Sequence, residues 1–120
     1  MKLLVIDDSK EITEMISFYL ESQGISCRVV NDGKEGLELI RSNHFDIILL
    51  DLAMPEFTGY DVLTALRKEN LLSENNIFIF TASSVNDSAI NDWLDMGARG
   101  ILRKPVSIDD LAELVEKYKS

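Results

Sequence analysis

Residues 45–55, FDIILLDLAMP, decide the fold of this 120-residue chain. Four consecutive apolar residues, 47–50, lead directly to the carboxylate of Asp51. Such an unalternated run indicates a strand that is covered on both faces, which is typical of the interior of a parallel sheet. Pro55 stops the strand from continuing, and Gly59 allows the chain to turn before the next segment. Asp51 is therefore predicted at the carboxyl end of a buried strand, where open α/β sheets bind ligands.

The rest of the chain alternates between short apolar runs and segments with helical spacing. Further strands are predicted near residues 2–7, 25–30, 77–81 and 100–104. No internal repeat, linker or low-complexity tract interrupts this alternation. The pattern predicts one α/β domain over residues 1–120, with five parallel strands and five helices.

Apolar residues at intervals of three and four identify the helices between these strands. Ser9 is predicted to cap the first helix and Gly24 to end it, and Ser107 is predicted to cap the last helix. Gly97 is predicted to end the fourth. The apolar stripe of the first helix is predicted to consist of Ile12, Met15, Ile16, Tyr19 and Leu20.

Composition excludes several classes of function. The chain has 12 Lys and Arg against 21 Asp and Glu, a net charge of -9, so direct binding to nucleic acid is not expected. No apolar run is long enough to cross a bilayer, and the chain opens with a strand pattern and not a secretion signal. Cys27 is the only cysteine and has no partner for an internal disulfide. A cytoplasmic location is therefore expected.

Chemically distinctive side chains follow four of the five predicted strands. Asp7 and Asp8 follow the first, Asp51 the third, Thr81 the fourth and Lys104 the fifth. Parallel strands bring these ends together, and three carboxylates about 5 Å apart would repel by roughly 3 kcal/mol per pair at an effective dielectric near 20. Since Lys104 alone cannot neutralise them, a further cation is required, and hard carboxylate ligands without histidine or thiolate favour Mg²⁺.

With these residues in place, the chain resembles the receiver domain of two-component response regulators, especially CheY-like single-domain members. The resemblance covers residues 1–120, and its pieces together are highly specific in order and spacing although each alone is weak. It implies a flavodoxin-like fold with strand order 2-1-3-4-5. The matching pieces are Asp7-Asp8, residues 51–55 with Gly59, Thr81-Ala82, and Gly97-Ala98 leading to Lys104-Pro105.

The resemblance also implies a metal-dependent reaction. Asp51 would accept a phosphoryl group from a sensor histidine kinase or a phosphotransfer protein. Asp8 and Asp51 would bind Mg²⁺ directly and Asp7 through water, and the backbone carbonyl of Ala53 would complete the protein ligands. The chain would not be an enzyme beyond catalysing its own phosphorylation and dephosphorylation.

Phosphoryl transfer also requires groups that neutralise the transferred oxygens. The Lys104 ammonium and the Thr81 hydroxyl are expected to contact them, together with the backbone N–H groups of Ala53 and Ala82. The resemblance further implies a cis peptide bond between Lys104 and Pro105, which an X-Pro bond makes inexpensive. Ala53 and Ser83 occupy positions that are linked to phosphoryl lifetime in the family; both are small here, and the lifetime stays open.

Because no output domain follows residues 119–120, the signal is expected to leave through protein contact. The expected surface is the face formed by the fourth helix, the fifth strand and the fifth helix. Thr81 would move toward the phosphoryl group and Ile101 would follow as the switch residue. Family members usually carry an aromatic residue at this position, so Ile101 is a departure, and a packing-driven response is expected from its few rotamers.

Rival interpretations stay open at this point. Each site residue alone could be a helix cap, a turn residue or a strand end. A pseudo-receiver would have the same fold without phosphorylation. A flavodoxin-like electron carrier would need a phosphate cradle where Asp7 and Asp8 stand. A haloacid-dehalogenase-like phosphatase would need a second acid at Ala53.

Overall fold

The computed structural model describes residues 1–82 and 86–119, so Ser83 lies outside the described part. Strands and helices alternate throughout, as the sequence predicts. The elements are β1 (Lys2–Ile6), α1 (Lys10–Ser22), β2 (Ser26–Val30), α2 (Gly33–Ser42), β3 (Ile47–Asp51), α3 (Gly59–Lys68), β4 (Ile77–Ala82), α4 (Asp87–Met96), β5 (Gly100–Lys104) and α5 (Ile108–Tyr118).

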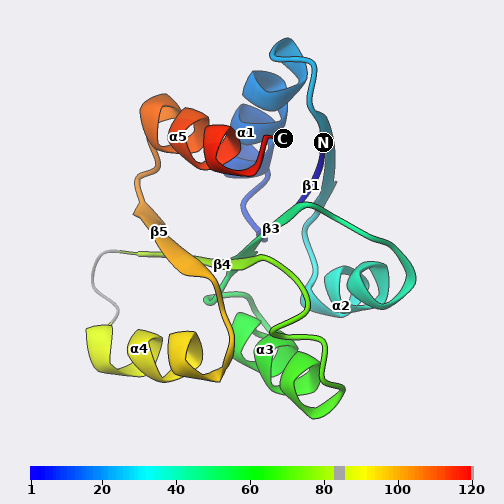
Figure 1. Ribbon diagram of the computed structural model, residues 1–120, viewed down its shortest axis with the longest axis vertical. Coiled ribbons are helices and arrows are strands. Elements are labelled where there is room, and N and C mark those ends of the chain that lie inside the picture. Colours follow the sequence, from blue (N-terminus) through cyan, green and yellow to red (C-terminus); the bar gives the residue numbers. More distant parts are fainter. Residues whose placement is uncertain (83–85, 120) are drawn as a thin grey trace.

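The five strands form one parallel sheet in the order β2-β1-β3-β4-β5, which confirms the predicted topology. Helices α1 and α5 cover one face, and α2, α3 and α4 cover the other (Figure 1). All five residues of the central strand β3 are buried. The unalternated apolar run is thus explained by helices on both sides of the sheet.

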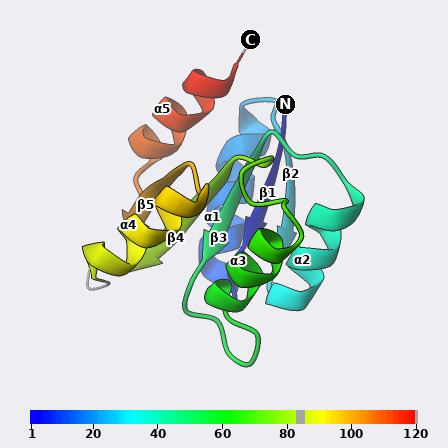
Figure 2. The same cartoon turned by 60° about the horizontal axis from the view of Figure 1, so that its bottom comes forward.

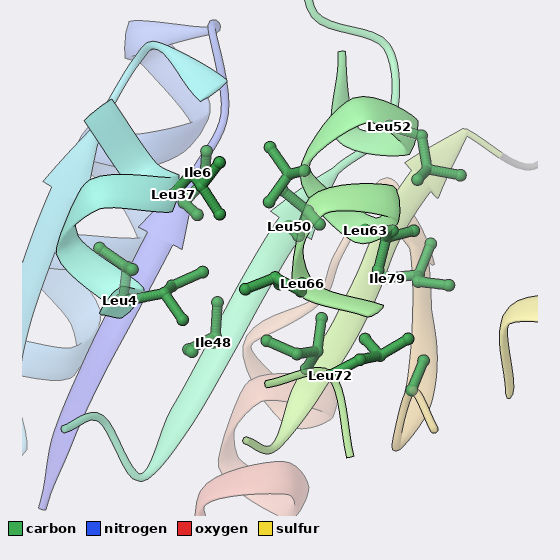
Figure 3. Packing of buried hydrophobic residues seen from close by; sticks show 14 of the residues in the cluster. Leu4, Ile6, Leu37, Ile48, Leu50, Leu52, Leu63, Leu66, Leu72 and Ile79 are labelled. Atoms are coloured by element: carbon green, nitrogen blue, oxygen red, sulfur yellow. The ribbon is translucent and has the colours of Figure 1, made fainter. Parts of the chain in front are cut away.

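Two hydrophobic clusters hold these layers together. One lies between the sheet and α2, α3 and α4. Figure 3 shows Leu37 of α2 beside Ile6 of the sheet, and Leu63 and Leu66 of α3 beside Leu50. The other lies under α1 and α5 and contains Ile16, Leu20, Leu111, Leu114 and Val115 from those helices. Side chains of each strand alternate between the two clusters, so neighbouring residues reach opposite faces.

Polar side chains begin the helices where the sequence predicts caps. The Ser9 hydroxyl accepts from the Ile12 N–H, and the Ser107 hydroxyl accepts from the Asp110 N–H. Gly97 follows α4 with φ of 131°, a left-handed conformation that favours glycine.

The predicted stripe of α1 is wrong at one position. Met15 is 43% exposed, whereas Thr13 is buried at 1%. The Thr13 hydroxyl can be buried because it donates to the Lys10 carbonyl and accepts from the Asn31 amide, at 3.1 and 3.3 Å. A threonine whose hydroxyl makes two hydrogen bonds is thus buried under α1, although the apolar pattern does not predict it.

Across residues 1–82 and 86–119, no helix combines the length and the apolar character that crossing a membrane requires.

Candidate functional site

Three aspartates meet at the carboxyl end of the sheet. Figure 2 shows the β3–α3 loop at this end. Carboxylate oxygens of Asp7, Asp8 and Asp51 all lie within 4.8 Å of one another. Asp7 and Asp51 are buried, at 0% and 2% exposure, while Asp8 is exposed. The structure thus brings together the acidic residues that the sequence singles out, with one of them open to solvent.

Lys104 reaches this cluster from the end of β5. Its Nζ lies 2.9 Å from Asp7 Oδ2 and 3.3 Å from Asp51 Oδ1. The peptide bond between Lys104 and Pro105 is cis, as the resemblance implies. One ammonium therefore faces two buried carboxylates.

The surroundings of Asp51 disfavour the ionised form of its carboxyl group. Burial, followed by repulsion from Asp7, raises the pKa of Asp51 to about 6 even though Lys104 opposes the shift. Burial disfavours the ammonium of Lys104, but its pairing with Asp7 and Asp51 outweighs burial and raises its pKa. The three carboxylates and one ammonium leave two negative charges, which favours the binding of a cation.

The surroundings of the two Asp7 carboxylate oxygens indicate whether the cluster suits a cation. Its Oδ1 accepts from the Ser9 N–H at 2.9 Å, and within the described part of the chain its buried Oδ2 meets the Lys104 ammonium, also at 2.9 Å. The same ammonium is shared with Asp51, so it does not neutralise both buried carboxylates. The remaining negative charge and the all-oxygen donor set fit Mg²⁺, which binds through one or two carboxylates and retains waters.

Two glycines allow other segments to pack closely against Asp51 and the loop that follows it. A Cβ at Gly59 would lie 2.1 Å from the Asp51 carbonyl oxygen, and a Cβ at Gly33 would lie 2.4 Å from the Phe57 carbonyl oxygen. Real Cβ contacts do not reach these distances, so both positions require glycine for close approach. The sequence identifies Gly59 as a turn residue, but the contact between Gly33 and the loop comes from α2, far away in the chain.

The other predicted site residues lie on the strand ends and loops around this cluster. Thr81 is buried, and Ala82 and Ala53 are exposed. The Ala53 N–H donates to Asp51 Oδ1 at 3.2 Å, so in this structure it contacts the carboxylate that the sequence predicts as phosphoacceptor. Ile101 pairs with Ile79 and packs against the cluster under α2, α3 and α4.

Two residues that support the cluster are not predicted from the sequence. The Asn31 amide donates to the Asp7 carbonyl at 2.8 Å. The ring of Phe80 lies under Lys104, with Nζ 4.9 Å from the ring centroid. No local signal could have identified either residue, since their partners lie 24 positions away and on another strand.

The response regulator receiver domain model matches residues 3–116 of this chain. The chain belongs to the response regulator receiver family. Phosphorylation and Mg²⁺ binding are typical of the family. The carboxylate cluster described above lies within the matched residues.

Similar receiver proteins come from several bacteria. The transcriptional regulatory protein DltR of Streptococcus agalactiae is 38% identical over 111 residues, which are 92% of this chain and 48% of DltR. Response regulator SaeR of Staphylococcus aureus is 30% identical over 123 residues, 97% of this chain and 52% of SaeR. The chain thus spans about half the length of the curated relatives it matches.

Solved structures show the same fold. The receiver domain of the Francisella response regulator 1452 has a TM-score of 0.84 and 38% identity, with 98% of this chain and 94% of that chain covered. The Vibrio cholerae chemotaxis protein CheY4 has a TM-score of 0.84 and 27% identity, with 98% of each chain covered. The predicted CheY-like fold is therefore confirmed.

Proposed function

We propose that this receiver domain accepts a phosphoryl group on Asp51 from a sensor histidine kinase or a phosphotransfer protein. The observation that carries the proposal is the buried Asp51 carboxylate with two other carboxylates within 4.8 Å and the Lys104 ammonium at 3.3 Å. An Asp51 oxygen forms the new bond to phosphorus, while the bond from phosphorus to the donor nitrogen breaks and its electron pair leaves with the imidazole. The product is an aspartyl phosphate.

The metal is proposed to bind at the same cluster. Asp8 and Asp51 would hold Mg²⁺ directly, Asp7 through water, and the Ala53 carbonyl would add a backbone ligand. When bound, the ion supplies positive charge that neutralises the oxygens of the transferred group. The close approach of three carboxylates, with one ammonium between two of them, supports this assignment.

Lys104 and Thr81 are proposed to contact the transferred group directly. The Lys104 ammonium has three N–H donors and already lies between Asp7 and Asp51, so it needs little movement to reach an added phosphoryl oxygen. The Thr81 hydroxyl and the N–H groups of Ala53 and Ala82 would donate to the remaining oxygens. Donors held in place before the reaction lower its reorganisation cost.

The signal is proposed to leave through the face of α4, β5 and α5, in contact with a downstream protein and not with nucleic acid. Arg103 at the end of β5 forms an ion pair with Asp87 of α4 and donates to the Ala82 carbonyl, which connects this face to the residue after Thr81. Ile101 would repack as Thr81 moves. Stand-alone action in the cytoplasm stays a prediction.

Acetyl phosphate with Mg²⁺ tests the chemistry. Mass spectrometry should find one added phosphoryl group, and peptide mapping should locate it at Asp51. A folded, Mg²⁺-saturated protein that gains no mass would instead support the phosphorylation-independent pseudo-receiver.

Beryllofluoride, a phosphoryl mimic, tests the output surface. Backbone amide shifts are expected at Ile101, Trp93 and Arg103 as well as in the loops around Asp51. Shifts confined to those loops would contradict the proposed route.

A further inference from the structure

The ring of Phe80 lies against the ammonium that the proposed reaction uses. Lys104 Nζ is 4.9 Å from the centroid of this ring, within the range of a cation–π interaction. Phe80 is 0% exposed, and the side chain of Lys104 is 21% exposed. The ring is fully buried and the ammonium side chain is mostly buried, so the attraction is stronger than at an exposed site.

The sheet register explains why the ring reaches this place. Phe80 on β4 is the direct partner of Asp51 on β3, and Ala82, two residues later, is the partner of Lys104 on β5. Residues two apart point to the same face of a sheet, so Phe80 lies beside Asp51 and diagonally across from Lys104. The ring and the two carboxylates thus contact the ammonium together.

An apolar cavity of about 380 Å³ lies next to this arrangement. Phe80 and Lys104 contribute to its wall. The remaining lining residues have no charged side chain; they are Ile12, Met15, Ala82, Pro105 and Val106. Lys104 has a flexible four-carbon stem, and the cavity offers it space to move away from Asp51.

We propose that Phe80 is a positioning residue for Lys104 in phosphoryl transfer to Asp51, an inference that rests on the proposed function. Its ring holds the ammonium beside the carboxylates and out of the cavity. A π face attracts a cation without accepting a directed hydrogen bond from it. The three N–H donors of Lys104 therefore stay available to Asp7, Asp51 and the incoming phosphoryl oxygens.

Phe78 provides a matched control on the same strand. It is also largely buried, at 9% exposure, and belongs to the same cluster under α1 and α5. Its ring packs edge-on against Tyr118, with the two centroids 5.8 Å apart, and not against the site. Phe78→Leu therefore reports the loss of aromatic packing, while Phe80→Leu reports that loss together with the loss of the ammonium contact.

The contact itself is tested first in the metal-free protein by NMR. Ring currents of Phe80 are expected to shift the Cε protons of Lys104 upfield. Phe80→Leu should remove this shift and Phe78→Leu should retain it. Equal Lys104 shifts in the two variants would overturn the proposed contact.

The role in the reaction is tested by the rate of Asp51 labelling at saturating acetyl phosphate and Mg²⁺. Phe80→Leu is expected to lower this rate about three- to tenfold, and Phe78→Leu to leave it within about twofold of wild type. The half-saturating concentrations should not change. In a Lys104→Met background, Phe80→Leu should change the remaining rate by less than about twofold, because the group it positions is gone.

Fluorinated phenylalanine at position 80 separates the effect of the ring's π face on the labelling rate from any effect of Phe80→Leu on folding. One to three ring fluorines weaken the negative π face with little change in shape, so the rate should fall with each added fluorine. A rate that is insensitive to fluorination, or an equal loss with and without Lys104, would overturn the role of Phe80 alone. Wild-type protein that is not labelled would overturn the proposed function, and this inference with it.

Discussion

The two ends of the sheet hold polar groups in opposite ways. At the amino end, Asp46 accepts from the Lys2 N–H at 2.7 Å, and Arg99 donates to Asn76 and to the Ser73 carbonyl, at 2.8 and 3.1 Å. These side-chain groups are satisfied within the fold. At the carboxyl end, the buried Asp7 and Asp51 share the single ammonium of Lys104, at 2.9 and 3.3 Å.

The difference separates residues that stabilise the fold from residues that oppose it. The amino-end bonds are exposed and connect neighbouring segments, so they contribute modestly to stability. The carboxyl-end cluster raises the pKa of Asp51 and leaves negative charge in a buried place, which lowers stability. Groups held at such a cost are typical of a functional site. The following experiments test this contrast.

The largest effect is expected for labelling by acetyl phosphate. Asp51→Asn should lower it at least about a hundredfold, because the amide is not a nucleophile for phosphorus. Asp46→Asn removes the same charge at the opposite end and should leave labelling unchanged. Equal labelling of Asp51→Asn and wild type, measured by intact mass, would contradict the assignment of Asp51.

Metal binding is expected to show the next effect. Mg²⁺ should raise the melting temperature of the wild type in proportion to occupancy. Asp8→Ala should weaken Mg²⁺ binding by about tenfold or more, since it removes a proposed direct ligand. Asp46→Asn is again the control at constant ionic strength. A wild-type melting temperature that is indifferent to millimolar Mg²⁺ would refute a magnesium site.

Asp51→Asn, which should abolish labelling, should stabilise the metal-free protein. Asp51→Asn is expected to raise the free energy of unfolding by about 2 kcal/mol at pH 7.5 in a chelator, because a buried charge is removed. The folded pKa of Asp51 is about 6, above the ordinary 3.8. The destabilisation by ionised Asp51 is therefore complete above pH 6 and is relieved as pH falls toward 4.

The gain in the free energy of unfolding that Asp51→Asn produces should shrink as the pH falls from about 6 toward 4. Urea unfolding of both proteins between pH 4 and 7.5 measures it. A gain that is constant with pH would show that ionisation of Asp51 is not its cause.

The smallest effect is expected at the amino end. Arg99→Ala should lower the free energy of unfolding by about 1 kcal/mol, since two exposed hydrogen bonds are lost. Labelling of Asp51 should not change. Slower labelling of this variant under conditions in which it is fully folded would show that the two ends of the sheet are coupled. It would contradict the contrast drawn between them.

Local patterns were sufficient for the elements and for most of the site. The run before Asp51 predicts a strand buried on both faces, and β3 is buried throughout. Ser9 and Ser107 cap their helices as predicted, since capping depends on residues only three apart. Met15 is exposed although helical spacing predicts it on the apolar stripe, because spacing alone does not show how far the covered face of a helix extends.

The sequence by itself determined the alternation of strands and helices and the order of Asp7, Asp51, Thr81 and Lys104 at strand ends. These features depend on periodicity, turns and the shared direction of parallel strands.

Only the tertiary structure decided the contact of Phe80 with Lys104, the support of Asp7 by Asn31 and the close approach of Gly33 to Phe57. Each contact joins segments that are far apart in the chain. The register of the strands and the packing of the helices on the sheet determine the distances between these side chains. Those distances also determine how strongly burial and repulsion raise the pKa of Asp51.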